Sequence, residues 1–129
     1  MVIVLIHWKI HLGAEQRRLF LRHWKETLTI EERSHLIGEY LSEPMPESKT
    51  GFPCTTFNVP TSSKYQSFFN VGVWDSVEAF KKLVVDPYVG TMFRTQPFEY
   101  EFRERMILTP LSWRAGNGKL LPENDHFSE

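Results

Sequence analysis

The sequence predicts a single α+β domain built on one antiparallel sheet, and three observations lead to this prediction. The chain has 129 residues, which is within the usual length of one domain. Short segments rich in β-branched and aromatic residues alternate with segments in which apolar residues recur at helical spacing. The segments follow in the order strand, helix, strand, strand, helix, strand, which is a split βαβ arrangement.

The first strand is predicted over residues 2–12 and ends at Gly13. Its even-numbered residues are all apolar, whereas the odd-numbered ones begin with Ile3 and Leu5 and become polar at His7. A strand that is apolar on both faces in its first half is typical of the centre of a sheet. Which face carries His7 stays open, because a slip of one residue moves every side chain to the opposite face.

The middle of the chain is predicted to form a helix, a short strand and a long connection. The helix covers residues 14–28, where apolar side chains share one face at Phe20, Leu21, Trp24 and Leu28. The second strand covers residues 36–42. Residues 44–64 then contain four prolines and many Ser and Thr, so we expect a long loop or hairpin excursion. Loops of this length are often functional, partner-contacting or mobile.

The third strand is predicted over residues 65–74 and leads into the second helix. Asp75 followed by Glu78 is a capping-box pattern for the start of that helix. Its apolar face is predicted to carry Val77, Phe80, Leu83 and Val84. A further helical turn is expected to begin at Asp86 and Pro87, because proline is favoured at the first helical position.

The fourth strand is predicted over residues 98–108, where apolar and charged residues alternate. Arg103 and Arg105 lie between the apolar positions, so we expect them to share a solvated face. The domain is predicted to end near residue 110. Residues 111–129 form a C-terminal extension whose apolar residues, including Trp113, predict docking on the domain or on a dimer partner.

Composition limits the classes of partner and compartment. The chain carries 15 basic and 16 acidic residues without a basic run, so we expect no nucleic-acid partner. The apolar start is too short for a membrane span or a signal peptide, so no membrane partner is expected. A single cysteine, Cys54, excludes an intramolecular disulfide and favours a cytoplasmic location. Aromatic residues make up 14% of the chain, which favours a bulky core, an apolar cavity or a buried subunit interface.

Three segments carry a resemblance to a known family. They are Gly13 before an acidic helix start at Glu15, the string VGVWDSVEAFKKLVVDPYV over residues 71–89, and RMILTP over residues 105–110. Together they resemble the antibiotic biosynthesis monooxygenase family of dimeric α+β barrels, whose pattern is matched here by Trp74, Ser76, Phe80 and Pro87. The resemblance covers roughly residues 1–110 and implies a ferredoxin-like βαββαβ fold with an antiparallel sheet.

The same resemblance implies a homodimer in which the two sheets face each other and an apolar cavity lies beside each sheet. Members of the family include cofactor-independent oxygenases acting on flat aromatic substrates, haem-degrading enzymes and proteins without known activity. Many members have histidines where this chain has Leu83 and Tyr88. The haem-degrading branch has a helical Trp and a His where this chain has Leu83 and Phe93, which disfavours haem degradation. No cofactor is therefore expected.

The candidate ligand-binding residues are His7, Trp8, Trp74, Tyr88 and Arg105. The tryptophans could stack on a planar ligand, His7 or Tyr88 could hold or move a proton, and Arg105 could bind an acidic group. The alternative for each residue is a purely structural role, in the core, at an interface or on a solvated face.

A metal site is not expected at His7 and His11. Four residues of a strand span roughly 13 Å, which is too far for two bonds to one ion. Cys54 has no neighbouring base that would activate its thiol. Two hypotheses remain: a monooxygenase-like enzyme acting on a small apolar or aromatic molecule, or a non-catalytic ligand-binding or association module.

Overall fold

The computed structural model describes residues 1–27, 32–53, 64–86, 94–112, 114 and 116. Four strands form one antiparallel sheet in the order β2-β3-β1-β4, which confirms the predicted fold class and the central place of the first strand. The elements are β1 (Val2–His11), α1 (Ala14–Glu26), η1 (Glu32–His35), β2 (Leu36–Ser42), α2 (Glu47–Thr50), β3 (Tyr65–Trp74), α3 (Val77–Phe80), η2 (Lys81–Val85) and β4 (Glu99–Leu108).

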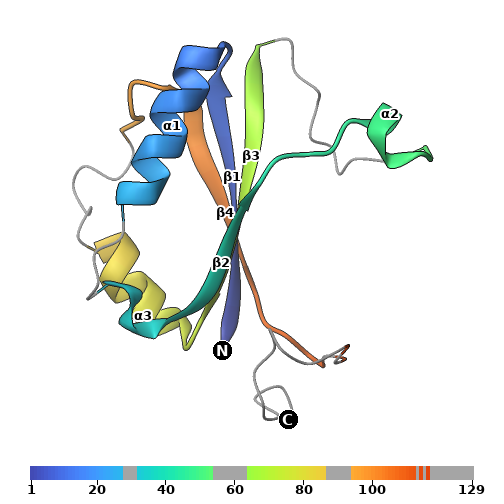
Figure 1. The fold of residues 1–129 in the computed structure, drawn as a ribbon. Helices are drawn as coiled ribbons and strands as arrows, with labels where there is room; N and C mark the ends of the chain where they lie inside the picture. Colours follow the sequence, from blue (N-terminus) through green and yellow to red (C-terminus); the bar gives the residue numbers. More distant parts are fainter. Residues whose placement is uncertain (28–31, 54–63, 87–93, 113, 115, 117–129) are drawn as a thin grey trace.

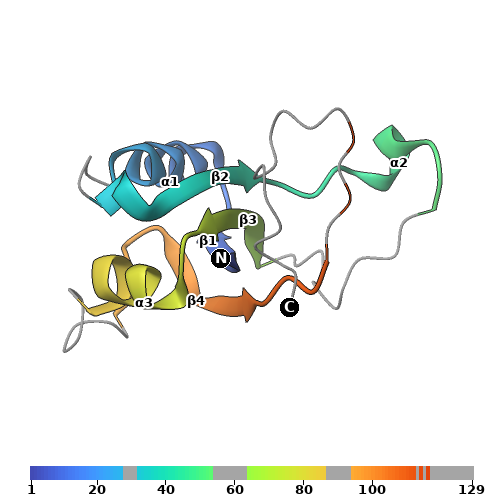
Figure 2. The same cartoon turned by 90° about the horizontal axis from the view of Figure 1, so that it is seen from below.

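The sheet has one face covered by helices and one face without them. Helices α1 and α3 lie on the same side of the sheet, whereas α2 projects away from it (Figures 1 and 2). Buried apolar residues gather beneath α1 and α3, where Trp8, Phe20 and Phe68 pack with ring centroids about 5 Å apart. The covered face is called the helix face below, and the other the open face.

The register of β1 assigns its residues to these two faces. Val4, Ile6, Trp8 and Ile10 are buried on the helix face. His7 pairs with Phe69 of β3 and with Glu104 of β4, and side chains of directly paired residues share a face. His7 therefore lies on the open face, which answers the question that the sequence left open.

Local hydrogen bonds explain how β1 joins α1. Gly13 precedes the helix with φ of 113°, a backbone conformation that glycine adopts without steric cost. The Gln66 side-chain amide donates to the carbonyl oxygens of His11 and Gly13 at 2.9 and 3.0 Å. These bonds hold the end of β1 against the start of β3.

The start of α3 differs from the predicted capping box. Ser76, not Asp75, is the N-cap residue, and its hydroxyl oxygen accepts a hydrogen bond from the Ala79 backbone N–H at 3.1 Å. Asp75 instead accepts a hydrogen bond from the His35 ring, with 3.0 Å between the two side chains. Helix α3 then continues into the π-helical turn η2, and the expected turn beginning at residues 86–87 lies almost wholly outside the described residues.

The fourth strand corrects one prediction. Arg103 and Arg105 do not share a solvated face but are partly buried on the helix face, where both line a cavity. Register shifts against β1 interrupt the expected alternation, so Glu101 and Glu104 both pair with open-face residues of β1. Met106 pairs with Leu5 on the same face and is 57% exposed. The part of the open face around Leu5, Val71 and Met106 is therefore apolar, and nothing covers it within the described part of the protomer.

The excursion after β2 contains the short helix α2, and residues 54–63, including Cys54, lie outside the described residues. Most of the predicted extension, including Trp113, also lies outside them. Among the helices that are described, none is long and apolar enough to cross a membrane.

Candidate functional site

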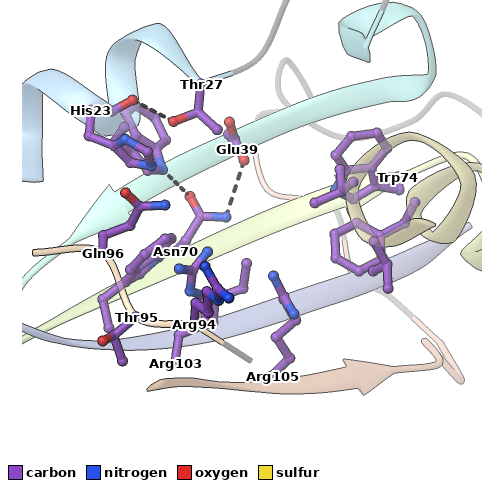
Figure 3. A pocket seen from close by; sticks show the side chains of 16 residues that line it. His23, Thr27, Glu39, Asn70, Trp74, Arg94, Thr95, Gln96, Arg103 and Arg105 are labelled. Carbon is purple, nitrogen blue, oxygen red and sulfur yellow. Dashed lines mark hydrogen bonds between the residues drawn. The ribbon is translucent and has the colours of Figure 1, made fainter. Parts of the chain in front are cut away.

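A cavity of about 380 Å³ lies between the helix face of the sheet and the helices α1 and α3 (Figure 3). Its volume is within the range of small-molecule sites. The largest side chains in its wall are aromatic, and branched residues complete the apolar part: Ile6, Trp8, Trp24, Trp74, Phe80, Val84 and Val85. The cavity is therefore shaped by rigid, flat surfaces contributed by strands and helices alike.

A chain of hydrogen bonds crosses the cavity wall from α1 to β2. The Trp24 indole N–H donates to Asn70 Oδ1 at 2.9 Å, and Asn70 Nδ2 donates to Glu39 Oε2 at 3.1 Å (Figure 3). The first bond fixes which end of the Asn70 amide points toward the carboxylate. Burial raises the pKa of Glu39, although the bond from Asn70 and the charge of Arg33 act in the opposite direction.

Buried polar contacts of this kind restrict motion because each group has its partner. With a raised pKa, the Glu39 carboxyl group can exchange a proton closer to neutral pH than an exposed glutamate does. It is thus a candidate proton acceptor or donor.

His23 of α1 contributes a second titratable group to the cavity. Its ring packs near Trp8 and Phe98, with centroid distances of 6.4 and 5.1 Å. Burial lowers the pKa of His23, and the positive charge of Arg103 lowers it further. The imidazole is therefore neutral at neutral pH and able to accept a proton.

Arg103 is held by a buried ion pair. Its Nε donates to Glu99 Oε2 at 3.3 Å, and its Nη2 donates to Glu99 Oε1. The Glu99 side chain is fully buried and also accepts a hydrogen bond from the Gln96 backbone N–H at 2.9 Å. The Arg103 guanidinium lies over the Trp8 ring, 4.1 Å from its centroid. Arg103 is thus a structural part of the wall.

Arg105, two residues further along β4, has no such partner. Its Nε is buried, and no group in the described part of the chain accepts a hydrogen bond from it. Trp8 Nε1 is likewise buried without an acceptor, and both side chains line the cavity. Burial lowers the pKa of Arg105, as does the neighbouring charge of Arg103. Arg94 adds a further guanidinium to the lining.

His7 lies in a separate polar group on the open face. Its Nε2 is 2.9 Å from Ser67 Oγ, and its ring stacks on Phe69 with centroids 4.7 Å apart. Glu104 Oε1 is 3.9 Å from His7 Nδ1 but only 2.6 Å from Lys9 Nζ, so its stronger partner is the lysine. Burial lowers the pKa of His7. Over the described residues, no group of His, Cys, Asp and Glu side chains is arranged to hold a metal ion.

Three of the five candidate residues meet in the cavity: Trp8, Trp74 and Arg105. His7 is on the opposite face of the sheet, and Tyr88 lies outside the described residues. Sequence reasoning did not identify His23, Trp24, Glu39 and Asn70 as site residues. Asn70 could have been identified from the sequence, because it is a polar residue between Phe68 and Trp74 on the buried side of a strand.

Comparison with known proteins identifies the fold. No protein-family model matches the chain, and no curated protein does. Among solved structures, an MhuD variant with two manganese protoporphyrin IX molecules bound per active site is similar, with a TM-score of 0.53 and 17% identity. That similarity covers 88% of this chain and 99% of the other.

A dimeric ferredoxin-like protein from an uncultured marine organism is also similar, with a TM-score of 0.57 and 14% identity over 90% of this chain and all of the other. Identities this low establish the fold and leave the activity open. The chain therefore has the ferredoxin-like α+β fold that its sequence predicted.

Proposed function

We propose that the cavity binds a flat, largely aromatic small molecule and that the protein oxidises it with O₂ without a cofactor. The observation that carries this proposal is the wall of three tryptophans and Phe80 around the Trp24–Asn70–Glu39 chain. Aromatic surfaces stack on planar ligands and exclude water, while a few fixed polar groups set orientation. The similar MhuD variant, which has two manganese protoporphyrin IX molecules bound per active site, lends support to a flat ligand.

In the proposed reaction, a proton leaves an acidic carbon of the bound molecule for Glu39 or His23. Both side chains line the cavity. The raised pKa of Glu39 makes its carboxylate a stronger base than that of an exposed glutamate, and the lowered pKa of His23 keeps its imidazole free to accept a proton. The resulting carbanion reduces O₂ directly. One oxygen atom replaces two hydrogens of the substrate to form a carbonyl group, and the other leaves with those hydrogens as water.

The activity is tested with a panel of anthrones, hydroxynaphthoquinols and porphyrins in thermal-shift and oxygen-electrode assays. We expect one class of planar compound to raise the melting temperature and to be consumed with oxygen uptake. Glu39→Gln keeps an acceptor for Asn70 and should slow oxygen uptake at least about tenfold while binding persists. Glu78→Gln, on the exposed start of α3, is the matched control.

Binding without oxygen uptake in the native protein would support a non-catalytic ligand-binding protein instead. If no planar compound raises the melting temperature, the proposal is wrong.

We further propose that the protein is a homodimer formed through the open face. That face exposes Met106 and Tyr40 and carries the partly buried Leu5 and Val71, and such an apolar surface is typical of a subunit contact. One similar structure is described as dimeric, which lends support.

Light scattering tests the dimer. Met106→Glu places a charge at the centre of the proposed contact and should give a monomer. Lys82→Glu, exposed on η2, should leave the dimer intact. A Met106→Glu protein that remains dimeric would move the interface elsewhere.

A further inference from the structure

Two hydrogen-bond donors in the cavity have no acceptor within the described residues: Arg105 Nε and Trp8 Nε1. Both nitrogen atoms are covered by protein. Buried donors are nearly always satisfied in folded proteins, because leaving one unpaired costs free energy. Arg105 also lines the cavity, and its guanidinium forms no salt bridge with the described residues, so an anionic ligand in the cavity would supply the missing partner.

The charge around Arg105 specifies what kind of acceptor fits. The charged groups that act on it are Arg103, which repels it, and Glu99, which attracts it. Glu99 already accepts hydrogen bonds from Arg103 and from the Gln96 backbone, so its oxygens are engaged. Arg94 adds another positive charge to the lining. The β4 side of the cavity therefore has an excess of positive charge.

The opposite side of the cavity has different chemistry. Glu39 of β2 accepts from Asn70 and has a raised pKa. Figure 3 shows Glu39 on one side of Asn70 and Arg94, Arg103 and Arg105 on the other. A ligand in this cavity thus meets a proton-exchanging group at one end and unneutralised guanidinium groups at the other.

We propose that the molecule bound in the cavity is an aromatic carboxylic acid whose carboxylate binds to Arg105. Guanidinium groups bind carboxylates through parallel charge-assisted hydrogen bonds, which are stronger than bonds between neutral groups. This inference rests on the proposed function, since it names the substrate class of the same site.

The experiment compares matched acids and amides by isothermal titration calorimetry on the 129-residue chain. The probes are 2-naphthoic acid against 2-naphthamide, and anthracene-2-carboxylic acid against its amide. We expect each acid to bind at least about tenfold more tightly than its amide. Arg105→Gln should remove that preference and leave amide binding within about twofold.

The control is Arg22→Gln, because Arg22 is exposed on α1 and pairs only weakly with Glu26 at 3.5 Å. It should keep the acid preference. Arg105→Gln removes an unpaired charge, so loss of folding is not expected, and circular dichroism checks this.

The outcomes separate the two proposals. Equal binding of acid and amide by the native protein, or an acid preference that survives Arg105→Gln, overturns the inference while the aromatic site stands. Failure of every probe, acid and amide alike, counts against the proposed function and so against this inference as well.

Discussion

Arg103 and Arg105 lie two residues apart on the same face of β4, yet their removal should change stability in opposite directions. Arg105→Met deletes a buried donor without a partner and keeps an unbranched apolar side chain of similar length. An unsatisfied buried polar group costs about 1–3 kcal/mol. Because Arg105 is only partly buried, we expect the free energy of unfolding to rise by about 1 kcal/mol, or the melting temperature by about 4 °C.

Arg103→Met leaves the fully buried Glu99 carboxylate without its guanidinium. Breaking one side of a buried ion pair costs about 3–5 kcal/mol. The Gln96 N–H remains as a donor to Glu99, so we expect a loss near the lower end, about 3 kcal/mol. The predicted difference between the two variants is therefore about 4 kcal/mol.

Urea unfolding of ligand-free protein measures both values, with tryptophan fluorescence as the signal and protein concentration held constant because association contributes to stability. If Arg105→Met is destabilised as strongly as Arg103→Met, Arg105 has a stabilising partner and the reasoning is refuted.

Three further predictions concern the cavity wall. Burial lowers the pKa of His23, so the unfolded chain binds a proton more readily than the folded chain, and the free energy of unfolding should fall as pH drops below about 6.5. In urea titrations, His23→Gln should make this fall smaller. Folding disfavours the charged form of Glu39, because burial raises its pKa. Glu39→Gln should therefore raise the melting temperature at pH 7 but not at pH 4. Gly72→Ala would place a methyl group 3.1 Å from Nε1 of Trp74, which is buried against Phe80 and cannot easily move away. The substitution should lower the free energy of unfolding by about 1 kcal/mol in urea, and a gain in stability would contradict this.

Much of the fold could be predicted because its signals are local. The bounds of β2 and β3 were predicted correctly, since each is a run of strand-forming residues ended by polar or proline residues. The two faces of β4 were not predicted correctly. Alternation shows which residues share a face, but it does not show which face the helices cover, and here both faces of the sheet carry apolar residues.

The site was only partly predictable for a related reason. Trp8 and Trp74 were identified because indole rings can stack on a planar ligand, and both line the cavity. The chain from Trp24 through Asn70 to Glu39 joins α1, β3 and β2, and no spacing along the sequence links these three residues. Such a site depends on sheet register, which single-sequence patterns determine weakly.

The π-helical turn η2 bears on how this cavity could change during evolution. In a π-helix each hydrogen bond spans one residue more than in an α-helix, as if one residue had been inserted into the turn. Val84 and Val85, the last two residues of this turn, both line the cavity. Deleting one exposed residue of this turn, such as Lys82, would restore the α-helical repeat and leave the residues on either side of the turn in their present orientation. The change would therefore be confined to the part of the wall that Val84 and Val85 form. A single-codon deletion could thus reshape the site without altering the sheet or the arginines of β4.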